Sequence, residues 1–119
     1  EHDELGEKKV DRDGYLADGR EYAVPAFAIG TKHPRRLYML AKEPSALLGF
    51  RDSYVFFMRN PDLKRVDANE EDRGYMDRNG LLPNTLRKRN ILLVSARSVF
   101  KKFGHLVVHN GRRWKDDYF

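Results

Sequence analysis

The segment 91–103 constrains the fold more than any other part of the sequence. Four of its apolar side chains recur at the spacing of one helical face: Leu92, Ala96, Val99 and Phe103. This spacing indicates a helix that buries one stripe, and Gly104 is the residue type preferred just past a helix end. We therefore expect the principal core helix here. Its first residues, 91–94, are also compatible with a strand.

The residues after this helix predict a β-hairpin. Two apolar segments, 105–108 and 112–114, flank the pair Asn110-Gly111. Asn-Gly favours the positive φ angles of a two-residue hairpin turn. We expect the chain to close on this hairpin. A helix followed by a basic hairpin is also how a winged-helix module meets DNA, so that arrangement is the specific alternative.

The N-terminal part differs in character from the rest. Residues 1–9 form a charged arm whose one sizeable apolar group is Leu5, so a partner or the domain surface must order it. Residues 10–24 hold two Asp-Gly pairs, which favour tight turns. Residues 22–29 suit a strand, in which Pro25 removes one backbone donor and favours an edge or a bulge.

The middle of the chain predicts a return to the core followed by helices. Residues 31–36 form a basic loop, and the apolar segment 37–41 comes after it. Pro44 is tolerated in the first turn of a helix, and Pro61 stops the next one. Asn69 can cap a further helix that begins with acidic residues, as the helix dipole favours. The expected helices are 45–50, 51–60 and 70–79, the last stopped by Gly80.

Together these segments predict a single compact α+β domain. It has a strand-rich N-terminal part, three to four helices and a C-terminal β-hairpin. The length of 119 residues, with 40% hydrophobic residues, suits one core. We assign residues 1–9 to the charged arm and residues 10–119 to the core domain.

Composition and motifs narrow the functional classes. The chain has no cysteine, which excludes disulfide frameworks and cysteine-based zinc sites. No apolar run approaches the ~20 residues that cross a membrane, and no signal peptide is recognisable. Gly-rich phosphate loops, nucleophile elbows and two-histidine metal motifs are absent from the sequence. We therefore expect no enzyme activity, cofactor, metal site, small-molecule substrate or membrane contact.

Two local clusters resemble sites but have simpler explanations. His105 and His109 would share a face only in a helix, and in the expected strand they lie roughly 13 Å apart. Each is better explained as a solvated or packed histidine. The consecutive acids Glu70, Glu71 and Asp72 fit the positive end of a helix.

Positive charge is concentrated after residue 30. Residues 1–30 carry eight acidic and four basic side chains, so their net charge is −4, which leaves +9 on residues 31–119 for the total of +5. Such a field attracts acidic partners, including nucleic acid. The basic clusters are Lys32, Arg35 and Arg36; Arg87, Lys88 and Arg89; Arg97, Lys101 and Lys102; and Arg112, Arg113 and Lys115.

These clusters allow two interpretations. The first is DNA contact, and its candidate residues are Arg97, Lys101, Arg112 and Arg113. The second is a solvated face or a protein contact. The run 87–89 is also of the type that serves as a nuclear signal.

The aromatic residues fall into two groups. Helical spacing favours the core, rather than base stacking, for Tyr54, Phe56, Phe57, Phe100 and Phe103. The second group lies at the C-terminus, near arginine residues, a combination that is typical of protein-binding hot spots. Packing of these aromatic side chains on the hairpin is the equal alternative. The candidate protein contacts are Trp114, Tyr118 and Phe119.

The order of several short segments resembles a known family. They are GEKKVDRDGYL at 6–16, GREY at 19–22, RLYMLA at 36–41, LGFRDSY at 48–54, SARSVF at 95–100, FG at 103–104, NGRR at 110–113 and DDY at 116–118. Over nearly the whole chain the sequence resembles the fungal subunits of the RSC and SWI/SNF chromatin-remodelling complexes. Pro44 departs from the uninterrupted helix of that family, which questions where the first helix starts.

The resemblance implies a non-catalytic nuclear subunit that helps assemble a remodelling complex, with ATP hydrolysed by another chain. The implied partners are other subunits of the complex, especially SWIRM-containing scaffold subunits and, in RSC, zinc-cluster DNA-binding subunits. The alternative is a winged-helix-like module that contacts DNA or the nucleosome. The family offers no catalytic residues to carry over.

Overall fold

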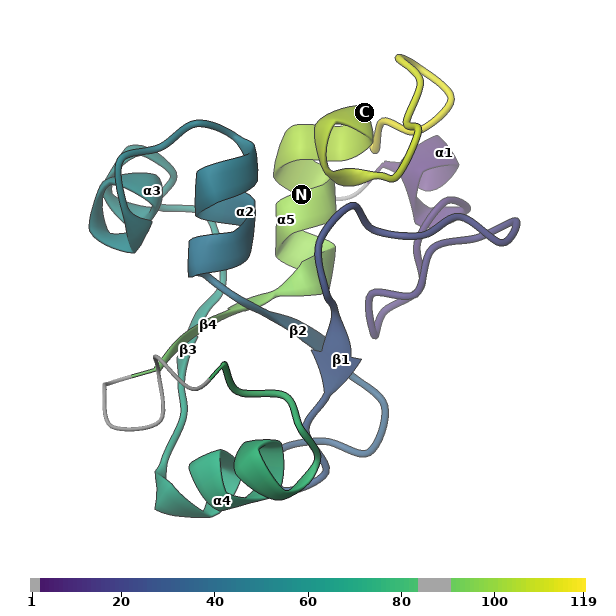
Figure 1. The fold of residues 1–119 in the computed structure, drawn as a ribbon. Coiled ribbons are helices and arrows are strands. Elements are labelled where there is room, and N and C mark those ends of the chain that lie inside the picture. Colours follow the sequence, from purple (N-terminus) through teal and green to yellow (C-terminus); the bar gives the residue numbers. More distant parts are fainter. Residues whose placement is uncertain (1–2, 84–90) are drawn as a thin grey trace.

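A four-stranded antiparallel sheet lies at the centre of the protein, with helices on both of its faces (Figure 1). The computed structural model describes residues 3–83 and 91–119, and the elements named below belong to these ranges. The strands are β1 (Phe27–Ala28), β2 (Leu37–Leu40), β3 (Arg65–Asp67) and β4 (Leu92–Ser95), in the order β1-β2-β4-β3.

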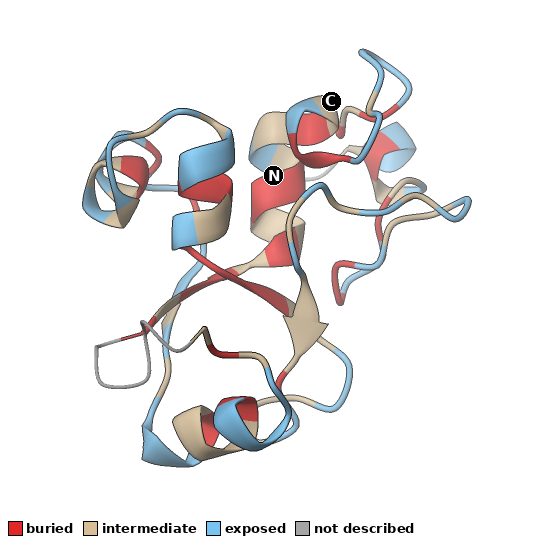
Figure 2. Cartoon of the chain, viewed as in Figure 1, coloured by how far each residue is buried: buried red, intermediate tan, exposed pale blue. Residues whose placement is uncertain are grey.

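The register of the two central strands divides the core. Met39 lies opposite Val94, and Leu40 lies opposite Leu93. Because side chains alternate between the faces of a strand, the first pair points to one side of the sheet and the second pair to the other. Figure 2 shows buried residues gathered on the central strands and on α5 (Ala96–Phe103).

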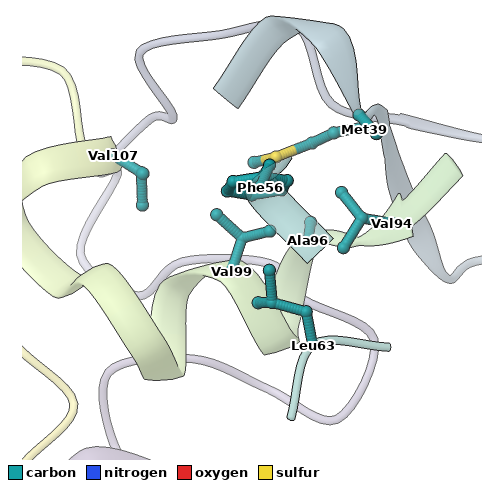
Figure 3. Packing of buried hydrophobic residues seen from close by; sticks show 8 residues of the cluster. Met39, Phe56, Leu63, Val94, Ala96, Val99 and Val107 are labelled. Atoms are coloured by element: carbon teal, nitrogen blue, oxygen red, sulfur yellow. The ribbon is translucent and has the colours of Figure 1, made fainter. Parts of the chain in front are cut away.

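The first face of the sheet is covered by α5, α2 (Lys42–Leu47) and α3 (Ser53–Arg59) (Figure 1). Phe56 of α3 is fully buried, and Figure 3 shows its ring beside Met39 and Val99. The ring also stacks on Phe103, with centroids 5.9 Å apart, and meets the edge of Phe50 at 5.3 Å. Burying a large apolar side chain contributes about 1.5–3 kcal/mol, so Phe56 is a principal support of this layer.

The second face is covered by α4 (Glu70–Arg78), which lies on the opposite side of the sheet (Figure 1). Met76 of α4 is fully buried and belongs to the same cluster as Leu40 and Leu93. Asn69 begins the helix with a capping box, because its side chain accepts from the Asp72 amide while the Asp72 carboxylate accepts from the Asn69 amide.

The two ends of the chain lie together beside α5 (Figure 1). The short helix α1 (Glu4–Glu7) packs against the last residues, and a single 3-10 turn, η2 (Gly104–Val107), follows α5. A third buried cluster joins Val10, Phe100, Val108 and Tyr118. The N-terminal arm is therefore ordered by the domain surface.

The α+β class predicted from the sequence is confirmed, and so are the helices expected near 51–60 and 70–79. The segment 91–103 divides into a strand and a helix: β4 pairs on both sides in the sheet, and α5 starts at Ala96 with Ser95 as its cap. The strand alternative for the first residues was correct. Sheet pairing outweighs helical periodicity there.

The C-terminal hairpin is corrected by the structure. Residues 105–114 form η2 and turns, and within the described residues their only β contact is a bridge between Tyr22 and Val108. Asn110 does have the positive φ, 53°, that the sequence favours. The turn it makes is local, because the Gly111 amide donates to the Val108 carbonyl. The wing of the winged-helix alternative is therefore absent from this segment.

Two further expectations are adjusted. Helix α2 begins at Lys42, ahead of the expected start, and Pro44 occupies its first turn. The N-terminal part holds little strand among the described residues, since only β1 joins the sheet and two isolated bridges accompany it. Turns at the two Asp-Gly pairs lie within this segment.

Candidate interaction surface

The N- and C-terminal segments hold each other through polar contacts, and we call residues 3–20 and 104–119 the terminal clasp. The Lys9 ammonium donates to the carbonyl of Trp114 at 2.8 Å and to the carbonyl of Asp117. Arg20 pairs with Asp116, whose Oδ2 also accepts from the Arg112 amide at 2.7 Å. The contacts of Lys9 and Arg20 link residues that are about one hundred positions apart.

Asp117 organises the C-terminal turn. Its Oδ1 accepts from the backbone amide of His105 at 2.7 Å and lies 2.7 Å from the His105 ring nitrogen Nδ1, while Oδ2 accepts from the Trp114 amide at 2.9 Å. Burial by itself would raise the pKa of Asp117, but these hydrogen bonds hold it below its usual value. The ionised carboxylate therefore ties η2 to the last residues.

Three glycines of the terminal clasp lie where a side chain would collide. A Cβ at Gly6 would come within 2.2 Å of the Tyr118 carbonyl oxygen. A Cβ at Gly111 would lie 2.2 Å from the His105 carbonyl oxygen, and one at Gly104 would meet the Asp117 carboxylate. The Gly6 approach lies between the two chain ends, and the other two lie within the C-terminal segment.

The candidate protein contacts differ in exposure. Trp114 is 79% exposed and Phe119 is 61% exposed, whereas Tyr118 is buried with 1% exposed. Phe119 packs its ring against the edge of Tyr118, with centroids 4.8 Å apart. Tyr118 therefore lies beneath the surface, and of the three candidates Trp114 and Phe119 are accessible to a partner.

The candidate DNA contacts also divide into two pairs. Arg97 forms an ion pair with Glu7 at 2.5 Å and donates to the Asp11 carbonyl at 3.2 Å. Lys101 lies 4.9 Å from the centre of the Tyr118 ring. These two cations therefore contribute to the terminal clasp. Arg112 and Arg113 are exposed on the C-terminal turn.

The basic loop is bound to acids of the same chain. Asp13 is nearly buried and lies within 4.0 Å of basic groups on His33, Arg35 and Arg36. The Arg35 guanidinium also lies over the Tyr15 ring, 4.6 Å from its centre. The loop therefore has a structural role. The basic run at 87–89 lies outside the described residues.

Asp72 joins the loop to α4. Its carboxylate pairs with the Lys32 ammonium at 2.8 Å and accepts from the Thr31 hydroxyl at 2.7 Å. Burial would raise the pKa of Asp72, but these two partners and the Asn69 amide lower it. The acids at the start of α4 thus lie in its first turn, as expected for capping.

One exposed pair was not expected from the sequence. Tyr54 and Met58 lie four residues apart on α3, and they are 68% and 58% exposed. Residues at this spacing are neighbours on one helix face. The prediction that Tyr54 belongs to the core was therefore wrong. The sequence could have indicated this exposure, because the apolar residues of α3 cover more than one face of the helix.

No group of three or more metal-binding side chains occurs among residues 3–83 and 91–119. In the same residues, no helix has the length and apolar character that a bilayer crossing requires. His105 is engaged with Asp117, and the His109 amide donates to the Glu21 carbonyl at 2.7 Å. The His105 ring is thus packed in the C-terminal turn, whereas the His109 side chain is exposed.

The terminal clasp joins residues from the two ends of the chain, and the sequence profile of one family covers both ends and everything between them. This profile, described as the chromatin remodelling complex Rsc7/Swp82 subunit, matches residues 1–119. The chain belongs to this family. The recognition of a fungal RSC and SWI/SNF subunit family from the sequence is thereby confirmed.

Relatives within the Rsc7/Swp82 family come from two yeasts. The chromatin structure-remodeling complex subunit RSC7 of Saccharomyces cerevisiae is 42% identical over 117 residues, which cover 98% of this chain and 27% of that protein. The rsc7 subunit of Schizosaccharomyces pombe is 37% identical, covering 98% of this chain and 30% of that protein. The SWI/SNF subunit SWP82 of S. cerevisiae is 31% identical, covering 98% of this chain and 19% of that protein.

The chain thus spans less than a third of the length of these relatives. No solved structure matches it.

Proposed function

We propose that the chain is a non-catalytic assembly subunit of a nuclear, ATP-dependent chromatin-remodelling complex of the RSC or SWI/SNF type. The observation that carries this proposal is the family match over residues 1–119, in a family whose relatives are named as subunits of both complexes. In this role the chain supports nucleosome remodelling and transcription regulation while another subunit hydrolyses ATP. Its proposed partners are the other subunits, above all SWIRM-containing scaffold subunits.

The proposed protein contacts are Trp114 and Phe119. Trp114 has a left-handed backbone, with φ of 67°, which costs a non-glycine residue about 1–2 kcal/mol. Its backbone is held by Lys9 and Asp117, yet its side chain is exposed. A fixed backbone that presents a bare indole loses little entropy on binding, and tryptophan is enriched in binding hot spots. Both points support a role in contact with a partner.

The test is affinity purification of the tagged chain from fungal nuclear extract at moderately high salt, with mass spectrometry of the bound proteins. We expect a remodelling ATPase and its SWIRM-containing scaffold. Trp114→Ala and Phe119→Ala should reduce their recovery, whereas Tyr54→Ala, which truncates an equally exposed aromatic on α3, should not. Recovery of the bait alone would contradict the subunit role, and equal recovery with all variants would contradict these two contacts.

Contact with DNA or the nucleosome is the second candidate function. It is favoured by Arg112 and Arg113, whose side chains are exposed on the C-terminal turn. Binding would weaken with salt by roughly one unit of logarithmic slope for each phosphate contact. Reversing both to glutamate should then abolish a gel shift with duplex DNA, while Arg59→Glu at the exposed end of α3 should preserve it. An unchanged shift would remove Arg112 and Arg113 from consideration.

A further inference from the structure

The sheet face that α4 covers is open at one end. Tyr38 lies opposite Ser95 in the sheet, and the Ser95 amide donates to the Lys64 carbonyl at 3.0 Å. Because side chains alternate along a strand, these residues share the face on which Leu40 and Leu93 pack with α4. The row of Tyr38, Ser95 and Lys64 lies two residues further along the strands. These three residues line a recess beside the α4 cluster.

This recess continues along α5. One part has a volume of about 340 Å³, and a second part of about 620 Å³ shares Lys64, Ser98 and Lys101 with it. We call the two parts together the cationic groove. Six basic side chains line it: Arg12, Arg36, Lys64, Arg97, Lys101 and Lys102.

The positive charge of the cationic groove is only partly balanced. Asp62 is the one acidic residue that lines the groove in the described part of the chain, and it pairs with Lys102 at 3.2 Å. Arg12 and Lys64 are exposed. Among the described residues, neither of their side chains makes an ion pair or a hydrogen bond. Two free cations thus lie in a groove that contains almost no acid.

The floor of the groove is fixed and partly apolar. The Ser98 hydroxyl oxygen of α5 accepts from the Lys64 amide at 3.1 Å, which holds the start of β3 against the helix. The buried ring of Tyr38 and the partly buried side chain of Val66 line the same part of the groove. Apolar side chains below cations suit a ligand that carries both carboxylates and small apolar groups.

The shape of the groove favours a polypeptide over DNA. A duplex is a wide, convex cylinder that proteins contact with protruding helices, arms or ribbons. Here the cations surround a recess between the sheet and α5. An extended chain is narrow enough to enter, and its alternating side chains can meet the floor and the rim in turn.

We propose that the cationic groove binds an extended acidic segment of a partner protein. Carboxylates of the segment pair with Arg12 and Lys64, and small apolar side chains between them pack on Tyr38 and Val66. This inference rests on the proposed assembly role in one respect, which is that the partner is a protein. Its test measures peptide binding to the purified chain, so its outcome is independent of the co-purification that tests the assembly role.

The test is fluorescence anisotropy with the purified chain and a labelled peptide of about ten residues, long enough at ~3.3 Å per residue to follow the groove. In this probe glutamate alternates with valine and serine. The reference peptide carries glutamine in place of glutamate. The test variant is Arg12→Glu with Lys64→Glu. The control is Arg59→Glu, an exposed cation at the end of α3 that lies outside the groove.

We expect the glutamate peptide to bind at physiological salt and the glutamine peptide to bind at least tenfold more weakly. The double reversal should weaken binding tenfold or more, while Arg59→Glu should change it less than twofold. Urea unfolding of each variant checks that these exposed substitutions leave the fold intact. Equal losses in both variants, or no preference for glutamate, would overturn the proposal. So would tighter binding of a DNA duplex that depends on Arg12 and Lys64, since the groove would then bind nucleic acid.

Discussion

The Tyr118 hydroxyl donates a hydrogen bond to the Glu7 carboxylate, and this contact joins the two ends of the chain. The same hydroxyl oxygen accepts from the Asp3 amide at 3.0 Å. Burial and the bond to Glu7 raise the pKa of Tyr118, so the phenol remains protonated and able to donate. The terminal clasp thus depends on a buried polar contact as well as on apolar packing.

We expect Tyr118→Phe to lower the free energy of unfolding by about 1 kcal/mol, because it removes the hydroxyl but keeps the ring. Urea unfolding followed by circular dichroism measures the change. Tyr15→Phe is the control, since Tyr15 is partly exposed and its hydroxyl makes no hydrogen bond among the described residues. Combining Tyr118→Phe with Glu7→Gln should cost less than the sum of the single changes, and strict additivity would contradict a direct contact.

We expect opposite effects from alanine at Gly74 and at Gly6. Gly74 lies inside α4, where a Cβ would approach only the mobile end of Arg78 at 3.0 Å, so alanine should stabilise by about 0.5–1 kcal/mol. Alanine at Gly6 would collide with the Tyr118 carbonyl and should destabilise by about 1–3 kcal/mol. Thermal unfolding compares both variants with the parent chain. A stabilising change at Gly6 would show that α1 is not packed as described.

We expect the contribution of Asp72 to stability to depend on pH. Its folded pKa is lowered, so the stability it adds is fully present above the ordinary pKa of about 4 and is lost as the pH falls through the lowered value. Asp72→Asn should therefore cost about 2 kcal/mol at neutral pH, where it breaks the pair with Lys32, and progressively less in acid.

The measurement for Asp72 is the urea midpoint of the parent and the variant between neutral pH and strong acid. Asp67→Asn serves as the control, because the Asp67 side chain is 82% exposed and lies 3.9 Å from Arg65. That change should have little effect at any pH. A constant difference between parent and Asp72→Asn across the whole range would contradict the lowered pKa.

We expect Trp114→Gly to leave stability unchanged or to raise it by about 1 kcal/mol, since glycine adopts the φ of 67° without strain. Trp114→Ala keeps that strain and should gain nothing. Trp114 is the chain's one tryptophan, so unfolding must be followed by circular dichroism. A loss above 1 kcal/mol in both variants would mean that the indole packs on the domain, which would remove the argument for a partner contact.

Local rules correctly predicted several elements. Asn69 and the acids after it predicted the start of α4, because a capping residue and the helix dipole act within one turn. The left-handed angle at Asn110 was likewise indicated by the Asn-Gly pair. The hairpin around that turn was wrong, because strand pairing needs a partner, and Asp117 instead holds the segment in η2. The same limit applies to residues 91–95, where the place of β4 between two strands outweighs helical spacing.

The sequence by itself determined the family, the α+β class and the positions of the helix caps and turns, since these depend on residue order and on neighbours within a few positions. Tertiary structure alone decided which residues are accessible. It buried Tyr118 while exposing Trp114, and it placed Arg97 in an ion pair with Glu7. It also brought Arg12 and Lys64 into one groove. The physical reason is that burial and ion pairing are set by residues far apart in the sequence.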